Sequence, residues 1–374
     1  MNRRNSKIRI DDDGRLEVVD PGFDSLELLR AVDPDFQVRH TRLPSFILPR
    51  FLRLRSFACS ISTENLFQES TDALWVEHTT ALDAIRGQEI AQPEIEGELS
   101  LLDLKIELAR RSLSNCHLCA HRCGVDRNGG ELGVCRLGTG ATVAEHFVHI
   151  AEEPPINPSL VLNLAGCGLR CRFCQQFALL EPNAVVGEEL NGELWSKLDT
   201  KGARSLSFVG GNPDESLYAI LRFLRDVPCT WNLPLVWNCH GYATLETIDL
   251  LEGVVDVFVP DFKYSNDDCG RRLSSIPNYP ETAKAGIAAM VGQGAPVIVR
   301  ILVLPEHFDC CHEPSLNFLA SLPDQRNLFI SLRGQYCPDW RISSRDEALT
   351  RRVTEDEMNS VNRRARDLGL QVID

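Results

Sequence analysis

The 374-residue sequence has no long hydrophobic run, no excess of basic residues and none of the common hydrolase motifs. No segment approaches the ~18 consecutive apolar residues of a membrane-spanning helix, so we expect no membrane span. The basic residues after Met1 lead into Asp11, Asp12 and Asp13 rather than an apolar stretch, which argues against a secretory signal. We therefore expect a cytoplasmic protein.

Basic residues are also too few for a nucleic-acid-binding surface. The formal net charge of -14 at pH 7 repels phosphate backbones, so we expect no nucleic-acid partner. One local exception runs from Arg39 to Arg55, where arginines are mixed with Leu, Phe and Ile. Such a stretch suits an acidic partner or a membrane surface, but Pro44 and Pro49 interrupt it. We favour packing onto the main domain.

The missing hydrolase motifs are Gly-x-Ser-x-Gly, His-Glu-x-x-His and the P-loop, so no hydrolytic function is indicated. Cysteine, in contrast, is abundant. The chain has 14 cysteines, which in an intracellular protein favour metal or redox chemistry. Seven of them form two tight clusters, within residues 116–135 and 167–174. We expect the others to be mostly buried small apolar residues: Cys59, Cys229, Cys239, Cys269, Cys310, Cys311 and Cys337.

Short apolar runs of strand length recur in the second half of the chain and alternate with segments of helical periodicity. The runs begin at Leu160, Ser205, Pro234, Val254, Ala295 and Asn327. Near-continuous apolar strands that alternate with helices are typical of a parallel sheet covered by helices. The six units predict an α/β fold, an incomplete (β/α)6 TIM-like barrel over residues 159–374. An N-terminal extension (1–110) and a small Cys-rich metal-binding segment (111–158) precede it.

The helices expected between these strands cover Glu215–Arg225, Leu245–Leu251 and Glu281–Val291. A last helix follows Thr354, which forms a capping-box pattern with Glu357 because each side chain can satisfy a free backbone N–H. Gly369 is well placed to end this helix.

The first predicted strand leads directly into the sequence Cys167-x3-Cys171-x2-Cys174. Three thiolates so close together can hold three irons of a 4Fe-4S cluster, which leaves the fourth iron without a protein ligand. That iron can bind the amino and carboxylate groups of S-adenosylmethionine (SAM). One electron from the reduced cluster would then cleave SAM into methionine and a 5′-deoxyadenosyl radical. The alternatives are a zinc knuckle or three buried thiols.

At this motif the sequence resembles the radical SAM superfamily. The resemblance implies that Phe173, the aromatic residue before the third cysteine, lies near the SAM adenine. It also implies that the backbone of Gly210, Gly211, Asn212 and Pro213 receives the SAM ammonium group at the end of the second strand. Asn212 stands where Glu is common in the superfamily. Compared with Glu, the Asn side chain keeps a carbonyl acceptor but lacks the negative charge. Taken alone, the four residues predict only a turn.

Further polar residues follow the other predicted strands and should meet at the mouth of the barrel: Asn238, His240, Asp261, Lys263, Arg300, Gln335 and Tyr336. Convergent polar groups suit a ligand with a carboxylate, a ribose and a sulfonium, and we assign Asn238, Asp261, Lys263 and Arg300 to the cofactor. Each could instead be a satisfied core or rim residue. Arg300 is the best candidate because a charge among Val, Ile and Leu requires a partner, such as a carboxylate of SAM or substrate.

The second cluster consists of Cys116, Cys119, Cys123 and Cys135. Four thiolates close in sequence suit a closed tetrahedral zinc site or a second iron-sulfur cluster, and spacing alone does not choose between them. Reduced structural thiols without metal are the third alternative. Glycines between the cysteines would provide the tight turns of a metal-wrapped loop.

The stretch from Cys116 to Tyr336 resembles the pyruvate formate-lyase activating enzyme-like proteins in which a Cys-rich segment precedes the cluster motif. CHLCAHRCGVDRNGGELGVCRLG, EEPPINPS, GCGLRCRFCQQ, FVGGNP and VDVFVPDFKY carry this resemblance. It implies hydrogen abstraction from a carbon of a protein substrate, with a glycine as the most natural target. Some activating enzymes carry ferredoxin-like inserts after the motif, whereas here the extra cysteines come before it.

The partners that we expect are SAM, an electron donor such as flavodoxin or ferredoxin, and a protein substrate. Two other functions remain open. One is radical modification of a small metabolite. The other is a non-catalytic iron-sulfur or zinc protein that transfers electrons or serves as a scaffold, although such a protein has no need of a SAM pocket.

Overall fold

The fold is organised around an open eight-stranded sheet with the strand order β10-β9-β8-β7-β6-β4-β3-β5. It is seen in a computed structural model that describes residues 8–10, 16–18, 49–86, 99–338, 341–342 and 347–373. Six neighbouring strands are parallel: β4 (Ser159–Leu164), β6 (Ser205–Gly210), β7 (Leu235–Cys239), β8 (Val257–Pro260), β9 (Val297–Leu302) and β10 (Leu328–Arg333). The predicted incomplete (β/α)6 barrel is confirmed.

Two antiparallel strands extend the sheet beyond β4. Strand β3 (Thr142–His149) pairs with β4, and the short β5 (Glu188–Glu189) pairs with β3. The segment before the first barrel strand therefore shares the sheet of the barrel, and the domain boundary at residue 158 stays a prediction. A separate antiparallel pair is formed by β1 (Ile8–Ile10) and β2 (Leu16–Val18).

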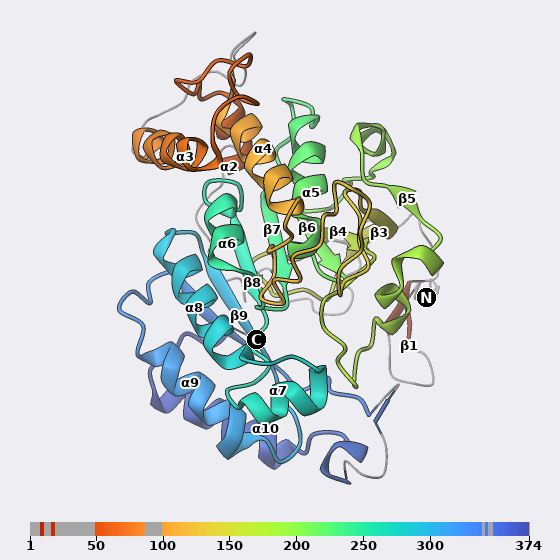
Figure 1. The fold of residues 1–374 in the computed structure, drawn as a ribbon. Coiled ribbons are helices and arrows are strands. Elements are labelled where there is room, and N and C mark those ends of the chain that lie inside the picture. The colour runs from red at the N-terminus through yellow and green to blue at the C-terminus, as the bar shows by residue number, and fades with distance from the viewer. Residues whose placement is uncertain are drawn as a thin grey trace, which may run out of the picture.

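Helices line the outside of the parallel strands (Figure 1). They are α5 (Leu217–Arg225), α6 (Leu245–Leu251), α7 (Asp267–Ser274), α8 (Tyr279–Gly292), α9 (Glu313–Ala320) and α10 (Glu355–Asp367). The expected helices are present, and Thr354 and Glu357 form the predicted capping box at the start of α10. No helix among the described residues is long and apolar enough to cross a membrane.

Three helices precede the Cys-rich segment: α2 (Arg50–Arg55), α3 (Thr71–Ile85) and α4 (Leu101–Leu113). Helix α4 packs against α5, and its buried leucines belong to the same hydrophobic cluster as the barrel. Helix α2 begins directly after Pro49 and buries Phe51 and Leu52 in that cluster. The described end of the arginine-rich stretch is thus packed onto the main domain as expected, and residues 39–48 lie outside the described residues.

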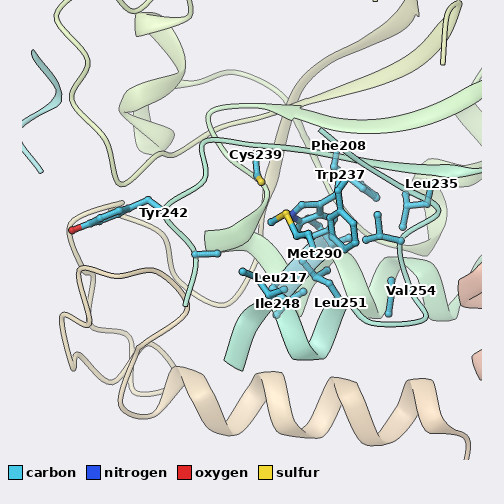
Figure 2. Close-up of a cluster of buried hydrophobic side chains, with 14 of the residues drawn as sticks. Phe208, Leu217, Leu235, Trp237, Cys239, Tyr242, Ile248, Leu251, Val254 and Met290 are labelled. Atoms are coloured by element: carbon cyan, nitrogen blue, oxygen red, sulfur yellow. The ribbon is translucent and has the colours of Figure 1, made fainter. Parts of the chain in front are cut away.

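Two hydrophobic clusters fill the two sides of the sheet because strand side chains alternate between its faces. On the helix side, Phe208 and Trp237 pack with residues of the covering helices such as Ile248 and Met290 (Figure 2). The inner side holds a smaller cluster: Ile156, Val236, Val257, Val259, Ile298, Phe329 and Ile373. Ile298 of β9 belongs to the inner cluster, whereas Val299 belongs to the helix side. Because side chains alternate along the strand, Arg300 lies on the inner side, like Ile298.

Candidate metal and cofactor site

The loop that carries Cys167, Cys171 and Cys174 leaves the carboxyl end of β4, as predicted. The end of helix α7 holds it in place, because the amide of Arg170 donates to the Ser274 carbonyl (3.0 Å) and that of Arg172 to the Leu273 carbonyl (2.8 Å). Carboxyl ends of parallel strands are the usual place for catalytic groups in β/α barrels. The loop therefore has both the location and the fixed backbone of a functional site.

The three thiols of this loop are in an environment that suits sulfur atoms bound to a metal. Burial raises the pKa of each thiol, that of Cys174 to about 11. The Ser274 hydroxyl donates to the Cys171 sulfur (2.9 Å), and the Leu169 amide donates to the Cys167 sulfur (3.4 Å). Burial of thiolates requires a compensating cation, and hydrogen bonds to sulfur are a usual feature of iron-sulfur sites. The residues present fit a 4Fe-4S cluster.

The spacing of sulfur atoms can be compared with that of a single-ion site. With Zn–S bonds of about 2.3 Å, tetrahedral zinc brings its sulfur ligands to about 3.8 Å from one another. Among the described residues, only Cys269, Cys310 and Cys311 form a group with all ligand atoms within 4.8 Å of one another. The three sulfur atoms of the Cys167–Cys174 loop do not form such a group.

The glycines at the end of β6 bring the next loop against the cysteine loop. The Gly211 amide donates to the Leu164 carbonyl (2.6 Å), and a Cβ at Gly211 would lie only 2.0 Å from the Gly166 carbonyl oxygen. Gly210 has a φ of +101°, which disfavours any other residue. These glycines are thus required for backbone packing beside the cysteines. Their contact with the SAM ammonium group, and that of Pro213, stays a prediction.

Asn212 belongs to a buried polar network beneath the cysteine loop. Its amide nitrogen donates to Asp214 (3.0 Å) and to Glu215, while its oxygen accepts from the His240 amide (2.9 Å). Glu215 also accepts from the Gly168 amide (2.9 Å) and pairs with the His240 ring (3.0 Å). Burial alone would raise the pKa of Glu215, but the charge and hydrogen bond of His240 lower it to about 2. The network therefore supports the loop with a buried carboxylate, a role that the sequence did not reveal.

Aromatic residues connect the cysteine loop with the last strand of the barrel. The rings of Phe173 and Tyr336 meet edge to face with centroids 5.8 Å apart. The Tyr336 hydroxyl donates to the Leu349 carbonyl (2.6 Å), and the side chain of Gln175 donates to the Gln335 carbonyl (3.3 Å). The first and last strand ends of the open barrel are thus joined at its mouth. The position of Phe173 beside the SAM adenine stays a prediction.

Lys263 and Asp261 form an ion pair at the end of β8, with 2.5 Å between Nζ and Oδ2. Burial alone would lower the pKa of Lys263, but the charges of Asp261 and Cys171 raise it. A cation is thus fixed close to the cysteine loop. Asn238 lies one strand away, in β7, paired with Val259 of β8. The structure places all three at the expected barrel mouth, and their contact with SAM stays a prediction.

Arg300 has its partners within the chain. Its guanidinium pairs with Glu152 (2.9 Å) and Glu153 (2.7 Å), and Arg333 also pairs with Glu153 (2.8 Å). The hydroxyl of Ser331 donates a further hydrogen bond to Glu153 (2.9 Å). Burial alone would raise the pKa of Glu153, but the two arginines lower it. The charge of Arg300 is therefore satisfied without a ligand carboxylate, and its assignment to the cofactor stays a prediction.

The upstream cysteines lie against the same loop. The His121 ring hydrogen-bonds the Gly168 carbonyl (2.8 Å), and the Ala120 amide donates to the Tyr242 carbonyl (2.9 Å). Three of the four thiols are buried and the fourth is partly buried: Cys116, Cys119, Cys135 and Cys123. No three of them come within 4.8 Å of one another in the described residues. This quartet therefore adjoins the cysteine loop.

The expectation for the scattered cysteines was only partly correct. Cys239, Cys269 and Cys311 are buried, whereas Cys229 is exposed and the others are partly exposed: Cys59, Cys310 and Cys337. More importantly, Cys269, Cys310 and Cys311 come together although about 40 residues separate the first from the other two. The adjacent pair Cys310-Cys311 was the only sequence signal for this group, and its third member depends on the tertiary fold.

Comparison with known proteins agrees with this site. A family model described as a 4Fe-4S single cluster domain matches residues 159–273, which include the cysteine loop. An uncharacterized protein of Methanocaldococcus jannaschii, MJ0674, is 33% identical over 311 residues, 80% of this chain and 89% of that protein. The chain belongs to the same family as MJ0674. The family model supports a 4Fe-4S cluster as a cofactor of this chain.

Solved structures show weaker similarity to this chain. A domain of pyruvate-formate lyase-activating enzyme from Bacteroides vulgatus is 20% identical over 37% of this chain and 80% of that chain, with a TM-score of 0.31. Streptococcus suis SuiB bound to its precursor peptide SuiA is 11% identical over 81% of this chain and 61% of that chain, with a TM-score of 0.44.

Proposed function

We propose that this protein is a radical SAM enzyme, which reductively cleaves SAM and abstracts a hydrogen atom from a carbon of its substrate. The observation that carries the proposal is the loop of two buried thiols and one partly buried thiol at the carboxyl end of β4, with hydrogen-bond donors aimed at two of the sulfur atoms. When bound, the reduced cluster supplies the electron that cleaves SAM into methionine and a 5′-deoxyadenosyl radical.

The residues of the chain have separate tasks in this proposal. Cys167, Cys171 and Cys174 hold the cluster, and the Ser274 hydroxyl stabilises charge on the Cys171 sulfur. The Gly210–Gly211 turn packs on the loop and offers backbone groups near it. Phe173, Asn212, Pro213, Asn238, Asp261 and Lys263 complete the proposed SAM site.

We infer a protein or peptide substrate, with a glycine Cα as the site of abstraction. Exposed apolar side chains flank both groups of cysteines, as expected where a large partner binds. Leu132 (49% exposed) and Val134 (41%) lie between the third and fourth cysteines of the quartet, and Phe177 (41%) follows Cys174 closely.

For the upstream quartet we infer a second iron-sulfur cluster, because four thiols lie together directly beside the loop of the proposed first cluster. Together with a donor such as flavodoxin or ferredoxin, a second cluster would supply electrons to the first. None of the cysteines forms a disulfide in the described residues, which suits the cytoplasmic location that we propose.

The test of the proposed function is the formation of 5′-deoxyadenosine by the anaerobically reconstituted full chain with dithionite and SAM. We expect the wild type to form it and Cys174→Ser to lose this activity, because the variant lacks one cluster ligand. Cys337→Ser is the matched control, since Cys337 is also partly exposed but lies outside both clusters. A wild-type protein that holds its cluster and binds SAM without forming 5′-deoxyadenosine would refute the catalytic proposal.

The substrate class is tested with an extract of source cells grown on glycine deuterated at Cα and separated into protein and small-molecule fractions. We expect deuterium to appear in 5′-deoxyadenosine only with the protein fraction, because the abstracted atom is transferred to the radical. Transfer only from the small-molecule fraction would instead establish a metabolite substrate.

The metal of the quartet is tested by exchanging Cys116, Cys119, Cys123 and Cys135 for Ser. Loss of about four irons per chain is expected for a second 4Fe-4S cluster. Loss of zinc with all iron retained would contradict this proposal.

A further inference from the structure

A group of metal-ligand side chains lies outside the site described above. Cys269 is on α7, whereas Cys310 and Cys311 are on η5 (Phe308–His312), a π-helical turn just before α9. The three sulfur atoms all lie within 4.8 Å of one another, and those of Cys310 and Cys311 are 3.7 Å apart. Single π-helical turns are rare and occur frequently at functional sites.

His307, the residue before η5, lies beside the three cysteines. Its Nδ1 lies 2.6 Å from the Pro305 carbonyl oxygen. Because a carbonyl can only accept, Nδ1 carries the proton and the lone pair is on Nε2. The His307 side chain also hydrogen-bonds Cys269. This tautomer, with one ring nitrogen donating to a backbone carbonyl, is the usual one for a histidine that binds metal through the other nitrogen.

We propose that Cys269, Cys310, Cys311 and His307 bind one zinc ion in a tetrahedral Cys3His site. Zn–S bonds of about 2.3 Å place the sulfur ligands of a tetrahedral zinc ion about 3.8 Å apart. The observed sulfur spacing is close to this value, so small rotations of the three cysteine side chains would bring their sulfur atoms to bonding distance of one ion. Thiolate and imidazole ligands select zinc over hard cations such as magnesium or calcium. A disulfide would require only two of the thiols and would not account for the third thiol or the oriented histidine.

The position of the site gives it a structural role near the catalytic loop. Ser274, which donates to the Cys171 sulfur, follows Cys269 by five residues on α7, about 7.5 Å along the helix axis. The hydroxyl of Tyr264 lies 2.8 Å from that of Ser274. Zinc would join α7 to the segment between β9 and α9. It would thereby fix the helix end that holds the cysteine loop.

The test is the zinc and iron content of the full chain after anaerobic purification. Cys310→Ser is the main variant because Cys310 is partly exposed and its exchange should leave the fold intact. Cys59→Ser is the control, since Cys59 is equally accessible but lies in no cluster. We expect wild type and control to hold about one zinc per chain more than the variant, with equal iron in all three. Any zinc bound at the quartet would be present in wild type and variant alike, so it would not affect the difference in zinc content between them.

A second measurement follows the visible absorption of added Co²⁺, which reports tetrahedral thiolate coordination. We expect the thiolate-to-cobalt bands of the wild type to be reduced in Cys310→Ser, and His307→Gln to bind Co²⁺ more weakly than wild type. Equal zinc contents and equal cobalt spectra in wild type and Cys310→Ser would overturn the proposal. So would a disulfide between two of the three cysteines in anaerobically purified protein without zinc. Neither result would bear on SAM cleavage, which is measured separately.

Discussion

At the scale of single residues, the contact from Ser274 to Cys171 connects a helix end with the proposed cluster. A hydrogen bond to a ligand sulfur stabilises the reduced, more negative cluster and so raises its reduction potential. We expect Ser274→Ala to lower the potential of the cluster in a redox titration followed by EPR. Ser360→Ala is the control, because the Ser360 hydroxyl donates only within α10, to the Asp356 carbonyl. An unchanged reduction potential in Ser274→Ala would mean that the Ser274 hydroxyl does not hydrogen-bond a sulfur ligand of the cluster.

A second residue-scale prediction concerns the stability contributed by Arg300. Its side chain is only 19% exposed and its main partner Glu153 is 1% exposed, so breaking the pair leaves a buried carboxylate with less compensation. We expect Arg300→Met to lower the free energy of unfolding by about 3–5 kcal/mol in urea denaturation. The exposed pair of Arg326 and Asp324 offers the control, and Arg326→Met should leave stability unchanged within error. If both exchanges changed the free energy of unfolding equally, Arg300 would not form a buried ion pair with Glu153.

At the scale of elements, a buried Lys–His contact joins two N-terminal helices. Lys105 of α4 lies 2.7 Å from His78 of α3, and burial lowers the pKa of Lys105 to about 7. In the unfolded chain this lysine keeps a pKa near 10.4. Between these values the unfolded state binds a proton that the folded state does not, so folding stability rises with pH across this window.

We therefore expect wild-type stability to rise between pH 7.5 and 9.5 relative to that of Lys105→Met, by up to about 1.4 kcal/mol per pH unit. Urea midpoints at several pH values measure the difference. Lys201→Met, at an exposed position, should follow the wild type. If Lys105→Met showed the same pH dependence as the wild type, the amine would be solvated rather than buried.

The elements themselves could largely be predicted from the sequence, for a physical reason. The parallel strands are buried by helices on one face and by the barrel interior on the other, so they appear as continuous apolar runs. Helix α7 was not predicted because its sequence DDCGRRLS is mostly polar and is started by an Asn266 cap rather than by an apolar stripe. The packing of α4 on α5 also could not be foreseen, since it depends on tertiary contacts across about 110 residues.

At the scale of the whole molecule, the chain brings three groups of cysteines to one end of an open barrel or to the helix that supports it. The loop of Cys167–Cys174 could be predicted because its ligands are local in sequence and follow a recognisable strand. Two other features could not. The Arg300–Glu153 pair spans 147 residues, and the Glu215–Gly168 contact joins loops from different strands. Sequence identifies a candidate charge or thiol, whereas only the fold shows what it contacts.

The central claim is that three cysteines hold a 4Fe-4S cluster whose fourth iron is open to SAM. Mössbauer spectroscopy of the protein reconstituted with ⁵⁷Fe, recorded with and without SAM, tests it most directly. Our account predicts that SAM changes the signal of about one iron per chain and that this change is absent in Cys174→Ser. A wild-type spectrum with a complete cluster that SAM leaves unchanged would contradict it.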